Sequence, residues 1–231
     1  MFFIDPYYLL FIAIPALVIS AFTQMYLKST FAKWSRVPNT EGMTGMEVAN
    51  TLFSRTSLNP IPLERAGGNL TDHYDPGANV VRLSDPIATQ PSIAAMAVAA
   101  HELGHVQQYQ TGSGLIAMRS ALLPALQFTP TISYISFTLG LLFNMAGLIW
   151  VGILFFGFMV LFSLLTLPVE FDASRRGLTL LKQAGLTDTA EEVAGARAVL
   201  TAAALTYIGA AITSVLQLLY YVSLARRSER Y

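Results

Sequence analysis

The chain has no cysteine, few charged residues and only three histidines among its 231 residues. Without cysteine there is no disulfide bridge and no thiolate metal ligand, so a metal would have to be held by His, Asp or Glu. Charged residues make up 12% of the chain, about half the share that is typical of a soluble domain. The formal net charge is zero, which argues against nucleic acid as a partner because no excess of positive charge is available.

Long stretches of the chain carry no charge at all. Residues 120–169 contain no Lys, Arg, Asp, Glu or His. This length is enough for two membrane-spanning helices of about 20 residues each. We place these spans at about 117–140 and 146–168, with the turn between them near Asn144.

Two further apolar stretches, at about 7–25 and 199–224, are also long enough to cross a bilayer. The predicted fold class is therefore mainly α: an integral membrane protein with about four transmembrane helices, forming a single membrane-embedded domain over residues 1–231. The alternative is a soluble helical core of unusual apolarity. So long a charge-free run is hard to fold in water, which favours the membrane.

Two polar regions separate these stretches, at about 26–115 and 169–198. Within the first, residues 79–84 are rich in β-branched side chains and are bounded by turn residues, which predicts a strand. This strand is either an exposed edge to which an extended substrate adds or an internal strand of a small sheet. A helix is predicted over residues 91–110, with Pro91 in its first turn.

Two of the three histidines lie on this helix, in the sequence His101-Glu102-Leu103-Gly104-His105. Residues four apart share a helix face, so both imidazoles can bind one ion at about 2.0–2.1 Å. Glu102 can reach a water at that ion and take its proton. The spacing predicts a zinc hydrolase with Glu102 as general base. The alternative is a pair of surface histidines that bind nothing.

A catalytic zinc site needs a third protein ligand, and here it must be a carboxylate. No acidic residue follows the histidines until Glu170, which we predict as the ligand, with Asp172 as the alternative. Two predicted spans separate His105 from Glu170, so both emerge on the same side of the membrane. Glu170 and Asp172 could instead be ordinary interfacial acids that are neutralised by Arg175 and Arg176. An Asp or Arg near a metal site can also act indirectly, by orienting a histidine ligand.

Six short stretches, spread from near residue 40 to near residue 210, match a known pattern. They are Gly42-Met43-Thr44-Gly45, Asp72-His73-Tyr74-Asp75-Pro76, Val81-Arg82-Leu83-Ser84, His101-Glu102-Leu103-Gly104-His105, Leu167-Pro168-Val169-Glu170-Phe171 and Ala202-Ala203-Ala204-Leu205-Thr206-Tyr207. With them the chain resembles the YugP-type neutral zinc metallopeptidases, a family of bacterial integral membrane proteins. More distantly it is similar to the membrane gluzincins that include the HtpX proteases.

The resemblance implies a zinc endopeptidase with a small α+β, zincin-like catalytic region at the membrane surface. In the membrane gluzincins the third ligand is a Glu that opens a helix after paired membrane spans, which is the place of Glu170 here. Their pattern often has an Asp four residues later, where this chain has Ser174. The implied cofactor is Zn²⁺.

A protease also needs a group that stabilises the oxyanion of the tetrahedral intermediate. His73, the third histidine, is our candidate for this catalytic role or for substrate binding. Alternatively, it is a loop histidine that is hydrogen-bonded to its Asp neighbours. Arg82, Arg175 and Tyr207 are further candidates for contacts with the oxyanion or the substrate, although a Tyr at the polar end of a span is commonly an interfacial anchor.

The distribution of basic residues predicts the orientation of the chain in the membrane. Lys28, Lys33 and Arg36 follow the first span, so the positive-inside rule places the catalytic region in the cytoplasm. Basic residues of the second polar region fall on the same side and agree: Arg175, Arg176, Lys182 and Arg197. Three arginines beyond the last span would lie outside and disagree: Arg226, Arg227 and Arg230. The expected location is the cell membrane, with several spans and the catalytic side cytoplasmic.

The favoured function is a zinc-dependent membrane endopeptidase that cleaves peptides or membrane proteins near the bilayer surface. The alternative is a catalytically silent, metal-binding adaptor or regulatory subunit, which would be favoured by a fourth protein ligand on the metal. A transporter ranks last because the charge-free stretch at 120–169 offers few polar side chains. The expected partners are a peptide or membrane-protein substrate and the lipid bilayer.

Overall fold

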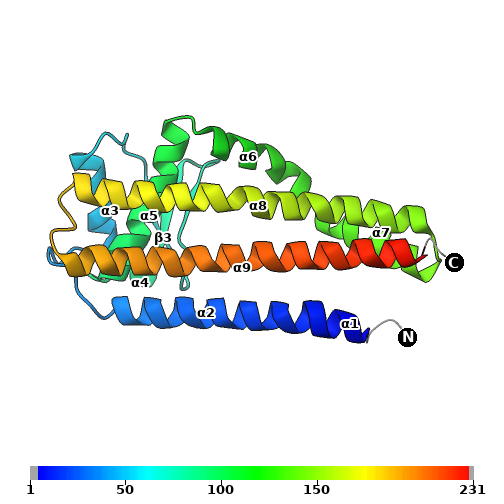
Figure 1. Cartoon of the computed structure of the whole chain (residues 1–231). Helices are drawn as coiled ribbons and strands as arrows, with labels where there is room; N and C mark the ends of the chain where they lie inside the picture. The colour runs from blue at the N-terminus through cyan, green and yellow to red at the C-terminus, as the bar shows by residue number, and fades with distance from the viewer. Residues whose placement is uncertain (1–4, 229–231) are drawn as a thin grey trace. The chain divides into compact units, whose positions relative to one another are not determined.

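The computed structural model describes residues 5–228, and these are mostly helical, as the sequence predicts (Figure 1). In chain order the elements are α1 (Pro6–Tyr8), the π-helix η1 (Leu9–Ala13), α2 (Ile14–Trp34), α3 (Gly45–Arg55), β1 (Leu63–Ala66), β2 (His73–Asp75), β3 (Val80–Ser84), α4 (Asp85–Thr89), α5 (Ile93–Gln110), α6 (Gly114–Leu126), α7 (Thr129–Leu142), α8 (Ala146–Gln183) and α9 (Ala190–Ser228).

The chain divides into two compact units that are each built from separate segments. The first comprises the described parts of residues 1–23, 117–168 and 206–231, and the second comprises residues 24–116 and 169–205. Three of the four boundaries of the second unit lie within two residues of those of the two polar regions read from the charge pattern, and the fourth lies seven residues beyond. Both predicted metal-binding segments therefore belong to one unit.

In the first unit, α7 and the N-terminal part of α8 form a tight helical hairpin (Figure 1). Asn144 takes a left-handed conformation between them, with φ of 52°, which confirms the predicted turn. The two helices approach closely because two glycines face the partner backbone. A Cβ at Gly140 would lie 2.6 Å from the nitrogen of Ile149, and one at Gly152 would lie 2.7 Å from that of Phe137.

The single span expected over residues 117–140 is broken into two helices, α6 and α7. Pro124 lies inside α6, and Pro130 lies in the first turn of α7. Because proline has no amide hydrogen and its ring disturbs the preceding turn, a helix tends to break there. Within the described residues, three helical segments are long and apolar enough to cross a membrane: Pro6–Trp34, Ala146–Gln183 and Ala190–Arg227. The predicted number of four transmembrane helices is therefore not confirmed.

In the second unit, helix α5 is the central element, and most of its side chains are buried. Ser92 caps its N-terminus by accepting a hydrogen bond from the nitrogen of Ala95. Pro91 therefore precedes the cap, rather than lying in the first turn as expected. The helix ends where Gly112 takes a φ of 64°, a conformation that favours glycine. This core holds the predicted metal-binding histidines on a rigid, largely buried helix.

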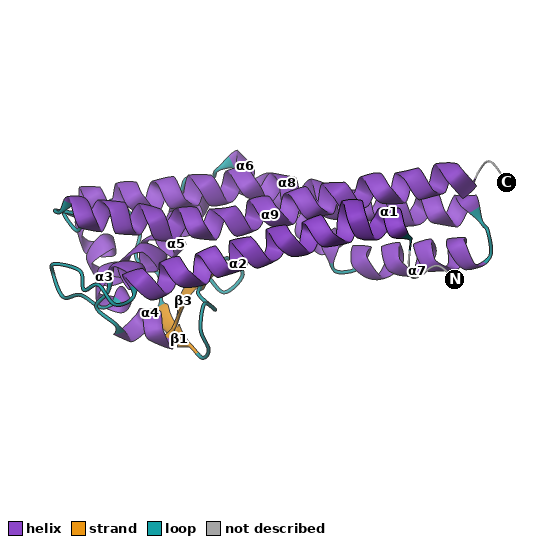
Figure 2. Cartoon of the chain, turned by 60° about the horizontal axis from the view of Figure 1, so that its bottom comes forward, coloured by secondary structure: helices purple, strands orange, loops and turns teal. Residues whose placement is uncertain are grey.

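The three strands form one small sheet with the order β1-β3-β2. Strand β3 pairs in parallel with β1 and antiparallel with β2, so it is the central strand. The expectation that residues 79–84 form an exposed edge is therefore wrong, and the internal alternative is correct. Strand β3 leads directly into α4. The strands, drawn in orange in Figure 2, lie beside this helix. The free edges belong to β1 and β2.

Candidate metal centre

His101 and His105 on α5 and Glu170 on α8 come together in the second unit. The Oε2 atom of Glu170 lies 3.3 Å from Nε2 of His101 and 3.7 Å from Nε2 of His105. One possible ligand atom from each residue lies within 4.8 Å of the others. All three side chains are largely buried. Two imidazoles and a carboxylate are therefore aimed at one small volume.

Glycines bring α8 close enough to α5 for this convergence. Gly104 stands between the two histidines, and a Cβ there would overlap the carbonyl oxygen of Ala173 on α8. About one turn of α5 before Gly104, the backbone at Ala100 meets Gly177 of α8, where a Cβ would lie 2.6 Å from the Ala100 oxygen. The helices thus touch through their backbones, which places Glu170 over the histidine-bearing face of α5.

The donor set fits a divalent metal, and zinc in particular. In the part of the chain from 5 to 228, the buried Oε2 atom of Glu170 accepts no hydrogen bond of acceptable geometry. A buried carboxylate oxygen without a donor is costly unless a cation is present. Two histidines and one carboxylate are a ligand set of catalytic zinc sites, which keep a further position open. No fourth ligand joins this group among the described residues.

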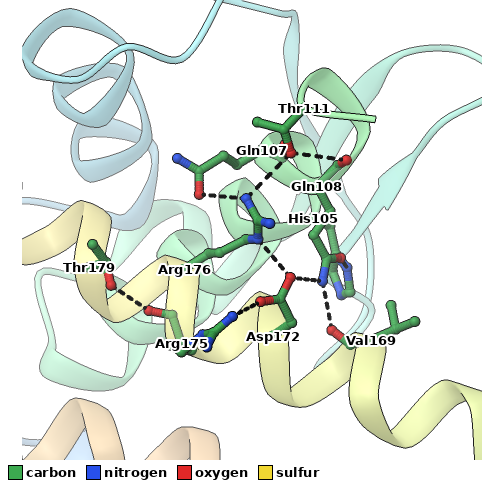
Figure 3. A network of polar contacts seen from close by, with 9 residues as sticks. All are labelled: His105, Gln107, Gln108, Thr111, Val169, Asp172, Arg175, Arg176 and Thr179. Atoms are coloured by element: carbon green, nitrogen blue, oxygen red, sulfur yellow. Dashed lines mark hydrogen bonds and ion pairs between the residues drawn. The ribbon is translucent and has the colours of Figure 1, made fainter. Parts of the chain in front are cut away.

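His105 is oriented by a chain of hydrogen bonds that ends on two arginines (Figure 3). Its Nδ1 atom lies 3.0 Å from Oε1 of Gln108, and Gln108 donates to Oδ2 of Asp172 at 2.9 Å and to the carbonyl of Val169 at 2.8 Å. Asp172 in turn accepts hydrogen bonds from Arg175 and Arg176. Such contacts fix the ring orientation of a metal-bound histidine.

His101 has a different partner, which is a hydroxyl group. Its Nδ1 atom lies 3.1 Å from the hydroxyl oxygen of Ser174. Ser174 is the position at which the gluzincin pattern implied by the sequence resemblance often has an Asp. A hydroxyl is a neutral acceptor, so it polarises the imidazole less than an Asp would.

The side chain of Glu102 is buried and lies against the sheet. Its Oε2 atom accepts a hydrogen bond of 2.9 Å from the backbone nitrogen of Tyr74 on β2. Burial raises the pKa of Glu102, although His101 and His105 act in the opposite direction. A carboxylate with a raised pKa is a stronger base, which suits the removal of a proton from water.

The other candidate residues have partners of their own. The exposed His73 places Nδ1 2.8 Å from the carbonyl of Thr71, rather than beside the flanking aspartates. Arg82 pairs across the sheet with Glu64 at 2.9 Å and with Asp75 at 2.8 Å, and the hydrogen bond from Arg82 lowers the pKa of Asp75.

The alternative ligand, Asp172, does not join the metal group but supports it through Gln108. Arg175 is bound to Asp172, and its side chain is otherwise exposed. Tyr207 belongs to the first unit and is partly exposed.

Sequence reasoning missed two contributors to the site. Gln108 follows His105 by three residues and so shares its helix face, a spacing that was available as a signal. The backbone nitrogen of Tyr74 carried no signal, because a main-chain donor becomes visible only when the tertiary structure brings β2 to α5.

Comparison with known proteins agrees with this geometry. Residues 8–226 match the model of a family described as "Putative neutral zinc metallopeptidase". The chain is also 41% identical over 213 residues to the "Putative membrane protease YugP" of Bacillus subtilis (strain 168), which covers 92% of this chain and 94% of that protein. No solved structure matches the chain. The family implies Zn²⁺ as cofactor, and the chain belongs to this family of neutral zinc metallopeptidases of the membrane.

Proposed function

We propose that the protein is a zinc-dependent membrane endopeptidase in which His101, His105 and Glu170 hold the metal. The observation that carries the proposal is the buried Oε2 atom of Glu170, which lies 3.3 Å and 3.7 Å from the two Nε2 atoms. In the described chain it accepts no hydrogen bond. A divalent cation between these atoms would satisfy all three side chains together.

The residues around this site have separate roles in hydrolysis. Zinc, when bound, would polarise a peptide carbonyl and make a water molecule more acidic. Glu102 would accept the proton of the attacking water and pass it to the leaving amine. Gln108 and Ser174 would hold the two imidazoles by their Nδ1 atoms, so that both Nε2 atoms stay directed at the metal. His73 remains our candidate for oxyanion or substrate contact.

Strand β2 is the element best placed to align a substrate. It is an edge strand, and the nitrogen of Tyr74 points away from β3 to the carboxylate of Glu102. Because Glu102 occupies the outward amide of Tyr74, an extended peptide would pair with this edge beside Tyr74, which would bring a backbone carbonyl near the general base. Substrates that are membrane proteins, cut in extended segments near the bilayer, fit a protease that is itself a membrane protein.

We also propose that the catalytic unit lies in the cytoplasm. Lys28, Lys33 and Arg36 belong to this unit and follow the first apolar helix, as the positive-inside rule expects of cytoplasmic segments. The silent adaptor is less favoured, since a structural zinc site is normally closed by four protein ligands and this group has three among the described residues.

The decisive experiment replaces the general base without removing the metal ligands. We expect Glu102→Gln to keep its zinc and its thermal stability but to lose at least about 100-fold in hydrolysis, since general-base catalysis contributes this much. Purified protein would be incubated with a proteome-derived peptide library, and new termini would be counted by mass spectrometry. The exposed Glu41→Gln is the matched control, and it should cleave as the wild type does. Equal cleavage by Glu102→Gln and the wild type would refute the assignment.

A further inference from the structure

A groove of about 610 Å³ lies in the second unit between helices α8 and α9. None of the three metal ligands lines it, although its wall reaches Ser174, whose hydroxyl oxygen lies 3.1 Å from Nδ1 of His101. On α8 its wall is a stripe with helical spacing that includes Phe171, Arg175, Leu178 and Lys182. Residues 193–204 of α9 form the opposite wall. The two helices run side by side along this stretch (Figures 1 and 2).

The groove combines an apolar floor with a positively charged rim. Leu200 and Ala204 of α9 form buried parts of the floor, and Leu178 of α8 is half-buried. Lys182 and Arg197 are exposed on the rim. No acidic side chain is among the described residues that line the groove. The cleft is therefore amphiphilic, with one sign of charge.

Two of the three rim cations have no counter-ion among the described residues, and the third is only partly neutralised. Arg175 is bound to Asp172, yet its side chain stays 78% exposed and keeps further donors free. Lys182 and Arg197 form no ion pair with any residue between 5 and 228. Unpaired cations around an apolar cleft are complementary to a ligand with an anionic head and an apolar tail.

The sequence of each wall indicates where such a ligand would come from. The α8 wall begins at Phe171, directly after the charge-free stretch that ends at Val169. The α9 wall, at residues 193–204, overlaps the start of the charge-free stretch at 199–224. Both walls therefore continue helices that are apolar enough to cross a membrane. Basic pockets between such helices are typical binding places for anionic lipid headgroups.

We propose that the groove between α8 and α9 binds an anionic phospholipid, with its phosphate at Lys182, Arg197 and Arg175 and an acyl chain along Leu178 and Leu200. The groove is lined by none of the three metal ligands, and lipid binding there does not depend on hydrolytic activity. The lipid is favoured over free phosphate because the floor is apolar. It is favoured over a peptide because the rim holds three cations and no acid among the described lining residues, whereas a peptide backbone carries no net charge.

Native mass spectrometry of the full-length protein in a mild detergent would test this proposal. We would titrate phosphatidylglycerol and phosphatidylcholine with identical acyl chains, and glycerol phosphate as the soluble headgroup. Phosphatidylglycerol should bind at least about tenfold more tightly than phosphatidylcholine, since each cation near an anionic headgroup contributes about a factor of five. Glycerol phosphate at millimolar concentration should not displace the lipid.

Three variants sharpen the test. The double change Lys182→Gln with Arg197→Gln should weaken phosphatidylglycerol binding about tenfold or more, because it removes two of the rim cations. Lys28→Gln with Arg36→Gln is the matched control; it removes the same types of exposed charge outside the groove and should change binding less than twofold. Thr201→Phe should fill the groove and abolish binding while leaving the rim charges in place.

Several outcomes would overturn the proposal. Equal affinity for the two lipids, or an equal loss in the control pair, would show general adsorption. Full displacement by glycerol phosphate would indicate a free-phosphate site. Unchanged lipid binding in Thr201→Phe would place the lipid elsewhere. If a fluorescent acidic peptide bound the wild type, but not the Lys182 and Arg197 variant, while lipid affinity stayed constant in both, the groove would be a peptide site.

Discussion

Gly104 occupies one of the two unconstrained positions of the zinc motif, and its lack of a side chain determines how the motif is completed. Any Cβ at this position would overlap the carbonyl oxygen of Ala173. The chain therefore uses glycine inside a helix, where it costs about 1 kcal/mol relative to alanine. In return α8 comes close enough for Glu170 to reach both histidines.

Replacing this glycine should weaken the metal site without touching a ligand. We expect Gly104→Ala to push α8 away from α5, to lower the free energy of unfolding by about 1–3 kcal/mol and to reduce zinc affinity. Zinc titration and thermal unfolding in detergent would measure both effects. Gly157→Ala is the control, because its Cβ would meet no atom within 4 Å. Wild-type zinc affinity in Gly104→Ala would contradict this account of the helix contact.

At the scale of elements, Gln108 and Asp172 connect α5 to α8 beside the metal ligands. Gln108 fills its hydrogen-bonding capacity with His105, Asp172 and Val169, and Asp172 is shared between Gln108 and two arginines. This bridge fixes the rotation of α8 about its own axis, and so determines which side chain points at the histidines. Asp172 is for this reason assigned a supporting role in our proposal, and Glu170 the role of ligand.

Breaking the bridge should affect both stability and metal binding. We expect Asp172→Ala to lower the free energy of unfolding by about 2–4 kcal/mol, because partly buried donors lose their acceptor. Zinc affinity should fall about tenfold, as is usual when a residue that orients a ligand is lost. The exposed Asp188→Ala serves as control, and Asp172→Asn should fall between them. An Asp172→Ala variant that binds zinc as tightly as the control would exclude this role.

At the scale of the whole molecule, the metal would join segments that are far apart in the sequence. The two histidines and Glu170 are separated by helices α6 and α7 and by much of α8. Bound zinc would therefore stabilise the folded second unit. We expect chelation to lower the melting temperature and added zinc to restore it, since a ligand at 1,000 times its Kd contributes about 4 kcal/mol. His101→Ala should show no such response to chelator, and a wild type without the response would contradict the metal assignment.

The number of membrane crossings can be tested with single cysteines, since the chain has none of its own. If α6 and α7 together cross the bilayer, the hairpin around Asn144 lies outside the cell and the residues after the first span lie inside. Met145→Cys should then react with an impermeant maleimide in intact cells, and Arg36→Cys should react only after permeabilisation. Labelling of both positions from the inside would show that α6 and α7 do not cross.

The sequence by itself determined the mainly helical class of the molecule and predicted the three side chains that the structure brings together as a possible metal group. Charge-free runs are long enough to identify apolar helices without any knowledge of packing, and the i, i+4 spacing of His101 and His105 is a property of one helix. Glu170 followed because it is the first acidic residue after the histidines. These inferences depend on local periodicity and on the high cost of burying charge, both of which are visible along a single chain.

The tertiary structure alone decided how these parts meet. The sequence predicted one span over residues 117–140 in which Pro124 and Pro130 could introduce a kink, whereas the break into α6 and α7 depends on how both prolines are accommodated in the folded chain. Whether residues 79–84 formed an edge or the centre of the sheet depended on pairing with two other short strands. The choice of Glu170 over Asp172 required the rotation of α8. Such features arise from contacts between distant segments, and their free energies are not encoded in the periodicity of any one segment.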